Sequence, residues 1–168
     1  MNFLKIILIF FFASLFFTNC AKKEKTSLIV EEDVESQMIQ AFKEGYKEFE
    51  AGDNLYAAKK FNEAELLFPQ SSWAPKAALM AAYVYYAQDY YFDAEAELKR
   101  FIKTYPKNPD IPYAHFLLAM CYYEKIVDEK KDLGPLLRAQ EKFNFIIKSY
   151  PESDYALDAE YKLDLIQD

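Results

Sequence analysis

Glycine is scarce in this sequence, with three residues among 168. The tight turns and bulges of β-rich proteins use glycine because it reaches backbone conformations that are closed to other residues. So few glycines argue against a turn-rich β fold. We therefore expect an all-α protein.

Side chains that carry out chemistry are also scarce. Histidine occurs once, as His115, and cysteine twice, as Cys20 and Cys121. His115 has no cysteine or carboxylate at the spacing of metal ligands, and the sequence contains neither a glycine-rich phosphate loop nor a nucleophile motif. We therefore expect no catalytic residue, no metal and no other cofactor. A cell-wall enzyme on a helical platform would need a catalytic domain, for which this sequence offers no motif.

The charge balance excludes a further class of partner. The formal net charge is −7, and only two of the twenty basic residues are arginines, Arg100 and Arg138. Neutralisation of phosphates supplies most of the affinity of proteins for nucleic acids. An acidic chain without a basic stripe is therefore not expected to bind nucleic acid.

The first 19 residues have the organisation of a bacterial export signal. A single charged residue, Lys5, precedes the apolar run Ile6–Phe17, which is shorter than the roughly 20 residues needed to span a bilayer. Cys20 follows this run closely, and the arrangement resembles a lipobox, in which the cysteine becomes the first mature residue and carries acyl chains. We expect a signal peptide over 1–19 and lipid attachment at Cys20. An uncleaved anchor and ordinary secretion are the alternatives.

The next segment, 20–35, is charged and lacks aromatic residues, which is typical of a flexible tether. Each buried CH₂ of an acyl chain contributes about 0.8 kcal/mol, so two or three chains on Cys20 would hold the protein on a membrane almost permanently. By resemblance to other lipoproteins, Ala21 after the cysteine indicates sorting to the outer membrane. We expect a lipid-anchored protein on its periplasmic face.

The stretch Ala77–Pro106 predicts a pair of helices. Ala77–Ala87 is small and aromatic on every face, whereas Phe92–Thr104 has apolar residues at helical spacing, including Leu98 and Phe101. The proline that follows stops the second helix. A hairpin this apolar needs similar neighbours to cover it.

Copies of this hairpin precede and follow it. A shift of 37 residues aligns the copies, and the second helix of the third copy is delayed to 45 residues by the charged segment Glu124–Pro135. The aligned columns are two of small residues, Gly45/Ala82/Ala119 and Ala57/Ala94/Ala139, one of large apolar residues, Phe61/Leu98/Phe143, and one of prolines, Pro69/Pro106/Pro151. Insertions in repeat proteins fall in loops, so Glu124–Pro135 is interpreted as a solvated loop or, alternatively, as a partner contact.

At these columns the chain resembles tetratricopeptide repeats. The resemblance implies an α-α superhelix over 36–168, with three full repeats at about 36–69, 73–106 and 113–151 and half of a fourth at 154–168. Repeat arrays usually end in a capping helix, so we expect the sequence to be part of a longer array. The expected N-caps of the first helices are Ser72, Asp110, and Ser153 or Asp154.

The first helices of the repeats carry an aromatic and apolar ladder, which we call the ladder. Its members stand at spacings of four and three residues and recur in each repeat: Phe42, Tyr46 and Phe49; Leu79, Tyr83 and Tyr86; Phe116, Met120 and Tyr123. In such solenoids the first helices line the concave face, so the ladder predicts a surface for substrates or partners. Apolar residues at helical spacing also form the core between repeats, and this alternative applies above all to Phe42, Leu79 and Phe116.

The export signal, the tether and the repeats together resemble the BamD family, also called YfiO or ComL. The most specific parts are Tyr85–Pro106, the long turn Lys107–Tyr113 and the insertion in the third repeat. The resemblance implies a non-enzymatic outer membrane lipoprotein of the β-barrel assembly machinery. Its partners would be BamA, other lipoproteins of the machinery and unfolded barrel proteins. An envelope scaffold of the Tol-associated, peptidoglycan-coordinating family is the alternative.

Overall fold

The computed structural model describes residues 33–128 and 133–167, which form seven α-helices and no strand. Contacts between Cα atoms divide the chain into Met1–Glu31 and Glu32–Asp168, and all seven helices lie in the second unit. The helices are α2 (Val34–Ala51), α3 (Asn54–Leu67), α4 (Ala74–Tyr86), α5 (Tyr91–Thr104), α6 (Ile111–Asp128), α7 (Gly134–Ser149) and α8 (Asp154–Gln167).

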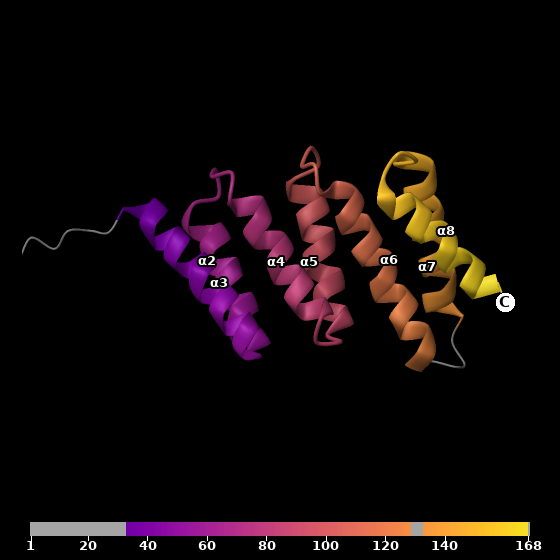
Figure 1. The fold of residues 1–168 in the computed structure, drawn as a ribbon, viewed down its shortest axis with the longest axis horizontal. Helices are drawn as coiled ribbons and strands as arrows, with labels where there is room; N and C mark the ends of the chain where they lie inside the picture. Colours follow the sequence, from indigo (N-terminus) through magenta and orange to yellow (C-terminus); the bar gives the residue numbers. More distant parts are fainter. Residues whose placement is uncertain (1–32, 129–132, 168) are drawn as a thin grey trace, which may run out of the picture. The chain divides into compact units, whose positions relative to one another are not determined.

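Each helix packs against the next one in the sequence, as Figure 1 shows for α2 to α8. The first helices of consecutive hairpins also meet, since α4 contacts α6 and α6 contacts α8. The pairs α2–α3, α4–α5 and α6–α7 are the three expected hairpins, and α8 is the first helix of the expected fourth. The structure confirms the predicted all-α fold of the tetratricopeptide-repeat type.

Small residues allow the two helices of a hairpin to approach closely. Gly45 on α2 faces Phe61 on α3, and a Cβ placed on Gly45 would lie 3.0 Å from Cδ1 of the Phe61 ring. The corresponding alanines Ala82 and Ala119 are fully buried, as is Ala94 on α5. The column of small residues therefore marks where the helices touch.

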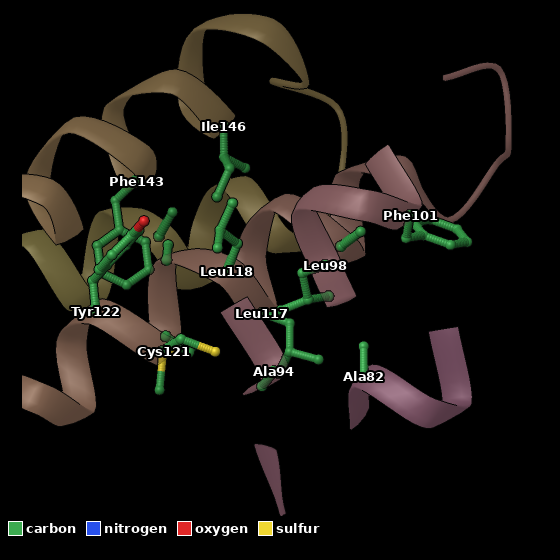
Figure 2. Packing of buried hydrophobic residues seen from close by; sticks show 14 of the residues in the cluster. Ala82, Ala94, Leu98, Phe101, Leu117, Leu118, Cys121, Tyr122, Phe143 and Ile146 are labelled. Atoms are coloured by element: carbon green, nitrogen blue, oxygen red, sulfur yellow. The ribbon is translucent and has the colours of Figure 1, made fainter. Parts of the chain in front are cut away.

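The large apolar column fills the space behind these contacts. Side chains of α5, α6 and α7 meet in one cluster, in which Leu98, Phe101 and Phe143 have no solvent exposure. Figure 2 shows these residues with Cys121 and Ile146 from the same cluster. The prediction that Leu98 and Phe101 belong to the core is confirmed.

The second helix of each hairpin ends shortly before a proline, as predicted. α3, α5 and α7 end two residues before Pro69, Pro106 and Pro151, and the intervening Phe68, Tyr105 and Tyr150 have φ of −141°, −122° and −137°. Their ψ values are 72°, 53° and 51°, so all three residues have left the helical conformation, which a following proline disfavours in its predecessor. The prolines thus set the length of each second helix.

One expected N-cap is wrong. The N-cap position of α4 is Trp73, not Ser72, and it is Ser71 whose Oγ accepts hydrogen bonds from the backbone N–H groups of Trp73 (3.2 Å) and Ala74 (3.1 Å) at the start of the helix. At α6 and α8 the expected Asp110 and Ser153 accept the first helical hydrogen bonds through their backbone carbonyls. The chain makes one more residue of turn before α4 than the spacing suggested.

A buried carboxylate joins the first hairpin to the second. Glu65 on α3 is almost fully buried and receives two hydrogen bonds from the Arg100 guanidinium of α5, at 2.8 and 2.7 Å. The Tyr105 hydroxyl donates a third bond to it, at 2.7 Å. The bidentate pairing fixes both distance and orientation, so it holds the two second helices in one arrangement.

A similar group joins the second hairpin to the third. Glu95 on α5 accepts hydrogen bonds from Lys125 (2.8 Å) and Tyr122 (2.7 Å) of α6, and from Lys99 (2.6 Å) of its own helix. Burial by itself would raise the pKa of Glu95, but these three donors outweigh it and lower the pKa to about 2. Glu95 therefore stays ionised at any physiological pH.

No helix within the described ranges combines the length and the apolar character needed to cross a membrane.

A candidate binding face on the first helices

The ladder lies on α2, α4 and α6, but its members differ widely in exposure. Leu79 and Met120 are buried in the core. Phe116 is half-buried, with its ring 5.6 Å from that of Tyr155 on α8 and 6.0 Å from that of Phe143 on α7. These three residues hold neighbouring hairpins together and offer little free surface.

The ladder residues Phe42 and Tyr46 on α2 line a hollow, which we call the α2–Trp73 hollow. Its volume is about 460 Å³, and its lining consists of Ile39, Phe42, Lys43, Tyr46, Lys47, Glu50 and Trp73. Tyr46 is 48% exposed and Trp73 is 41% exposed, although both are large aromatic residues. An accessible apolar concavity with a few polar groups at its edge is the usual form of a binding site.

Aromatic contacts shape the floor of the α2–Trp73 hollow. The Phe42 ring lies edge-on to the rings of Phe61 and Trp73, with centroids 5.2 Å apart in both cases. Edge-to-face pairs at this distance are favourable, and Phe61 is fully buried beneath Phe42. Trp73 stands at the start of α4, where its backbone N–H donates a hydrogen bond to Ser71. The floor is therefore fixed before any ligand arrives.

Lysines surround the α2–Trp73 hollow. Lys43 and Lys47 line it, and Lys76 on α4 places its Nζ 4.9 Å from the centroid of the Trp73 ring and 5.9 Å from that of Phe42. Glu50 is the one carboxylate of the lining. The hollow is thus cationic at its edge although the whole chain carries −7. The cationic edge and the aromatic floor favour an apolar ligand that also carries negative charge.

The remaining ladder residues form a half-buried aromatic surface along α4 and α6. Phe49 on α2 lies edge-on to Tyr83 on α4, at 5.9 Å between centroids. Tyr86 lies 5.8 Å from Tyr91, and burial raises the pKa of Tyr86 to about 12. Lys162 on α8 places its Nζ 4.6 Å from the ring of Tyr123. Tyr83, Tyr86 and Tyr123 are half-buried and keep part of their surface free.

Sequence reasoning missed several lining residues. Trp73 is the single tryptophan of the chain, but the 37-residue shift pairs it with Asp110, so it belongs to no column. Ile39 precedes the first ladder residue on the same side of α2, and Lys43 and Lys47 belong to none of the repeat columns. The sequence feature that could have indicated Trp73 as a lining residue is its position in the turn before α4, next to two serines.

The few potentially reactive side chains, His115 and Cys121, are packed among other side chains of the repeats. The His115 ring packs against the rings of Phe145 and Tyr150, at 4.7 and 5.8 Å between centroids, and its buried Nδ1 has no hydrogen-bond partner among the described residues. Cys121 is a free, fully buried thiol whose pKa burial raises to about 12. Across residues 33–128 and 133–167, no group of three or more His, Cys, Asp and Glu side chains is placed to hold a metal ion.

Some predicted features lie outside the described residues. They are the signal peptide over 1–19, the lipid attachment at Cys20, most of the tether, and residues 129–132 of the insertion. The flanking parts of that insertion lie in α6 and α7.

Comparison with known proteins gives a consistent result. A family model described as "YfiO: Outer membrane lipoprotein" matches residues 34–168. Among curated proteins, "Outer membrane protein assembly factor BamD" of Caulobacter vibrioides is 33% identical over 149 residues, which cover 89% of this chain and 48% of that protein. The protein of the same name from Rickettsia prowazekii is 34% identical over 112 residues, covering 67% of this chain and 45% of that protein.

A third relative is more distant. The BamD protein of Neisseria gonorrhoeae is 27% identical over 128 residues, covering 70% of this chain and 48% of that protein. The chain therefore spans about half the length of the curated relatives that it matches. The family model covers all seven helices, including those that form the α2–Trp73 hollow. On these grounds the chain belongs to the BamD (YfiO) family of outer membrane lipoproteins.

Proposed function

We propose that this protein is a non-enzymatic scaffold of the machinery that assembles β-barrel proteins in the outer membrane. Its relatives carry the name of outer membrane protein assembly factors. Lipid attachment at Cys20 would hold it on the periplasmic face of the outer membrane. In that position its repeats would bind unfolded barrel proteins on one side and BamA with the other lipoproteins of the machinery on another.

The observation that carries the proposal is the open α2–Trp73 hollow, together with the half-buried tyrosines on the first helices α4 and α6 of the next two hairpins. Barrel signals are extended segments that end in aromatic residues, and the hollow offers an aromatic floor of suitable chemistry. Burial of one large apolar side chain contributes about 1.5–3 kcal/mol. Ordering a flexible segment costs roughly 2–5 kcal/mol. One filled pocket would thus bind weakly, and useful affinity needs the hollow and the tyrosine surface together.

Membership of the machinery can be tested by purification from membranes. The full chain with a C-terminal affinity tag is isolated in mild detergent, and the co-purifying proteins are identified by mass spectrometry. We expect BamA and other assembly lipoproteins to co-purify. Recovery of Tol components without BamA would contradict the proposal and would favour the Tol-associated alternative. An untagged strain controls for proteins that adhere to the resin.

A further inference from the structure

The second helices of the three hairpins share an exposed apolar position near the turn that joins each of them to its first helix. The residues are Leu55 on α3, Phe92 on α5 and Leu137 on α7, which are 58%, 74% and 60% exposed. The shifts of 37 and 45 residues align them, so they form a further repeat column, which we call the turn-edge row. Apolar residues exposed singly are common on protein surfaces, but this exposure recurs in every described hairpin.

The exposure of the turn-edge row does not depend on a missing neighbour. The hairpin α4–α5 has another hairpin on either side of it, and Phe92 is nevertheless the most exposed member of the row. Leu55 likewise stays exposed although α4 packs against α3. The row lies on the edge of the domain where α2, α4 and α6 end and α3, α5 and α7 begin (Figure 1). A hairpin added to such an array lengthens this edge and does not cover it.

The side chains at this edge are of the kind found where a bilayer meets water. Lys125 of α6 places its Nζ 3.9 Å from the centroid of the Phe92 ring, and the same Nζ donates a hydrogen bond to Glu95 at 2.8 Å. Tyr90 and Leu133, the N-cap residues of α5 and α7, are 44% and 68% exposed at the same turns. Aromatic rings and the stems of lysines favour the membrane interface because each has an apolar body and a polar end or neighbour.

The exposure within the row favours a bilayer over a protein as its partner. Each member stands on a different hairpin and is more than half exposed, so the three side chains cover one another little. Protein interfaces place their main contacts in one well-packed centre from which water is excluded. A fluid bilayer takes up separate side chains one by one, so it accommodates a row of this kind.

The proposed attachment of Cys20 brings a bilayer within reach of this edge. Twelve residues separate Cys20 from Asp33, the first described residue. A chain of this length spans up to roughly 45 Å when it is extended. α2 begins at the opposite edge of the domain and has 18 residues, so it is about 27 Å long. The tether is therefore long enough to leave the turn edge on the membrane, and in this respect the inference rests on the proposed function.

We propose that the turn-edge row inserts into the surface of a lipid bilayer and holds the repeats on it in one orientation. The same turns carry the exposed carboxylates Asp53, Asp89 and Asp93, and the whole chain carries −7, so anionic lipid is not favoured. The row fits a zwitterionic surface, into which its apolar side chains insert while the shorter carboxylates stay in the hydrated headgroup layer.

The test places single tryptophans in the full 168-residue chain, which is purified in detergent and reconstituted into phosphatidylcholine vesicles. Trp73, the only tryptophan of the sequence, is first replaced by phenylalanine. The reporters are Leu55→Trp, Phe92→Trp and Leu137→Trp. The matched control is Leu66→Trp, because Leu66 is 77% exposed and lies about three helical turns from Leu55 on the same helix. Phosphatidylcholine brominated in its acyl chains quenches a tryptophan that reaches them.

We expect the three reporters to lose most of their emission in brominated vesicles, and Leu66→Trp to keep its emission. Addition of anionic phosphatidylglycerol should not increase the quenching. Phe92→Asp should restore much of the emission of Leu137→Trp, because the row inserts as a unit. Circular dichroism checks that each variant is folded, which the exposure of these positions favours.

Flotation with the vesicles reports attachment of the chain, whereas quenching reports the row, so failure of one is distinguished from failure of the other. A chain that does not float would overturn both the attachment and the inference. Flotation without quenching, or equal quenching of Leu66→Trp, would overturn the inference alone and assign the row to a protein partner or to no partner. Emission that depends on protein concentration and not on bromination would overturn it by assigning the row to a second copy. The vesicles contain lipid alone, so the result is independent of co-purification with BamA.

Discussion

Gly45 and Phe61 touch so closely that a side chain at position 45 would require the Phe61 ring to shift by a few tenths of an ångström. A Cβ there would lie 3.0 Å from Cδ1, 3.1 Å from Cε1 and 3.2 Å from Cγ of the Phe61 ring. Phe61 is fully buried and also forms the base under Phe42, the floor of the α2–Trp73 hollow. This contact therefore connects the packing of the first hairpin with the shape of its binding face.

Gly45→Val should destabilise the protein. Overpacking of a well-filled site costs about 1–3 kcal/mol, which outweighs the small gain in helix propensity of valine over glycine. Gly45→Ala should cost less, because alanine in a helix gains up to about 1 kcal/mol over glycine. Urea denaturation at neutral pH measures both variants.

A double-mutant cycle tests whether Phe61 is the cause. Phe61→Leu alone should destabilise the protein by leaving a cavity. In the double variant with Gly45→Val, the loss of stability should be smaller than the sum of the two single losses, since leucine leaves space for the new methyl groups. Strict additivity of the two changes in unfolding free energy would show that the contact is not the source of the effect.

Loss of the Glu95 network should change the acid stability of the protein. The pKa of Glu95 is lowered to about 2 in the folded state, from an ordinary value of 4.5. The stabilisation is thus complete above about pH 4.5 and is lost as the pH falls towards 2. Glu95→Gln should remove this part of the pH dependence and should cost on the order of 3 kcal/mol at pH 7, because it leaves Lys125 buried without a counter-charge.

The control for Glu95 is Lys99→Ala, which removes the more exposed of its two lysine partners. Exposed ion pairs contribute under about 1 kcal/mol, so this variant should change stability little. Urea midpoints at pH 7 and pH 3 distinguish the two cases. If Glu95→Gln and Lys99→Ala gave the same small loss of stability at pH 7, the buried pair of Glu95 with Lys125 would not contribute the stability expected of it.

His115 should make the protein less stable in mild acid. Burial lowers the pKa of His115 in the folded state below the ordinary value of 6.5. The unfolded chain therefore takes up the proton first, so stability is complete above about pH 6.5 and falls as the pH decreases below it. His115→Phe keeps a ring against Phe145 and Tyr150 and should abolish this dependence.

The measurement for His115 is the melting temperature at pH 7.5 and pH 5.5. Between pH 7.5 and pH 5.5, the melting temperature of the parent should fall further than that of His115→Phe. Because both proteins keep the Glu95 network, whose titration lies at lower pH, the difference between them isolates the histidine. Equal losses in the two proteins would contradict the assignment.

Cys20 should be the site of acylation. Metabolic labelling with palmitate should mark the parent chain, and Cys20→Ala should lose the label and be released from the outer membrane fraction. Cys121→Ala is the matched control, because Cys121 is buried and inaccessible to modification in the folded protein. Labelling of Cys20→Ala to the level of the parent would refute lipid attachment at this residue.

The repeat columns predicted the fold because each has a local physical cause. Gly45 and the buried alanines mark helix contacts, and the prolines mark helix ends, so spacing alone recovers the three hairpins. The spacing did not predict that α4 begins after Trp73 or that Ser71 bonds to its first N–H groups, since two adjacent serines offer the same chemistry and only the backbone decides between them.

The binding face was only partly predictable. Helical spacing gives the face on which Leu79 and Tyr46 lie, but it does not tell which residues the next hairpin covers, and the structure buries Leu79 while leaving Tyr46 open. The lining by Trp73 and the pairing of Glu65 with Arg100 join residues about 35 positions apart in the sequence. Such contacts depend on the angle between hairpins, which a repeat pattern does not specify.

The most direct test of the account asks whether a barrel signal occupies the α2–Trp73 hollow. A photo-reactive phenylalanine derivative replaces Tyr46, Tyr83 or Tyr123 of the full chain, one at a time, and a labelled peptide ending in an aromatic residue is added before irradiation. Leu66 on α3 is the control position, because its side chain is 77% exposed and lies outside the ladder. The same experiment is repeated in Trp73→Ala.

The account predicts strong crosslinks from Tyr46, weaker ones from Tyr83 and Tyr123, and none from Leu66. Trp73→Ala should reduce the Tyr46 crosslink at least about tenfold, since the contact of one large apolar side chain with the bound peptide is worth about 1.5–3 kcal/mol. Crosslinks from Leu66 in place of Tyr46, or a Tyr46 crosslink that Trp73→Ala leaves intact, would contradict the central claim that this hollow receives the substrate.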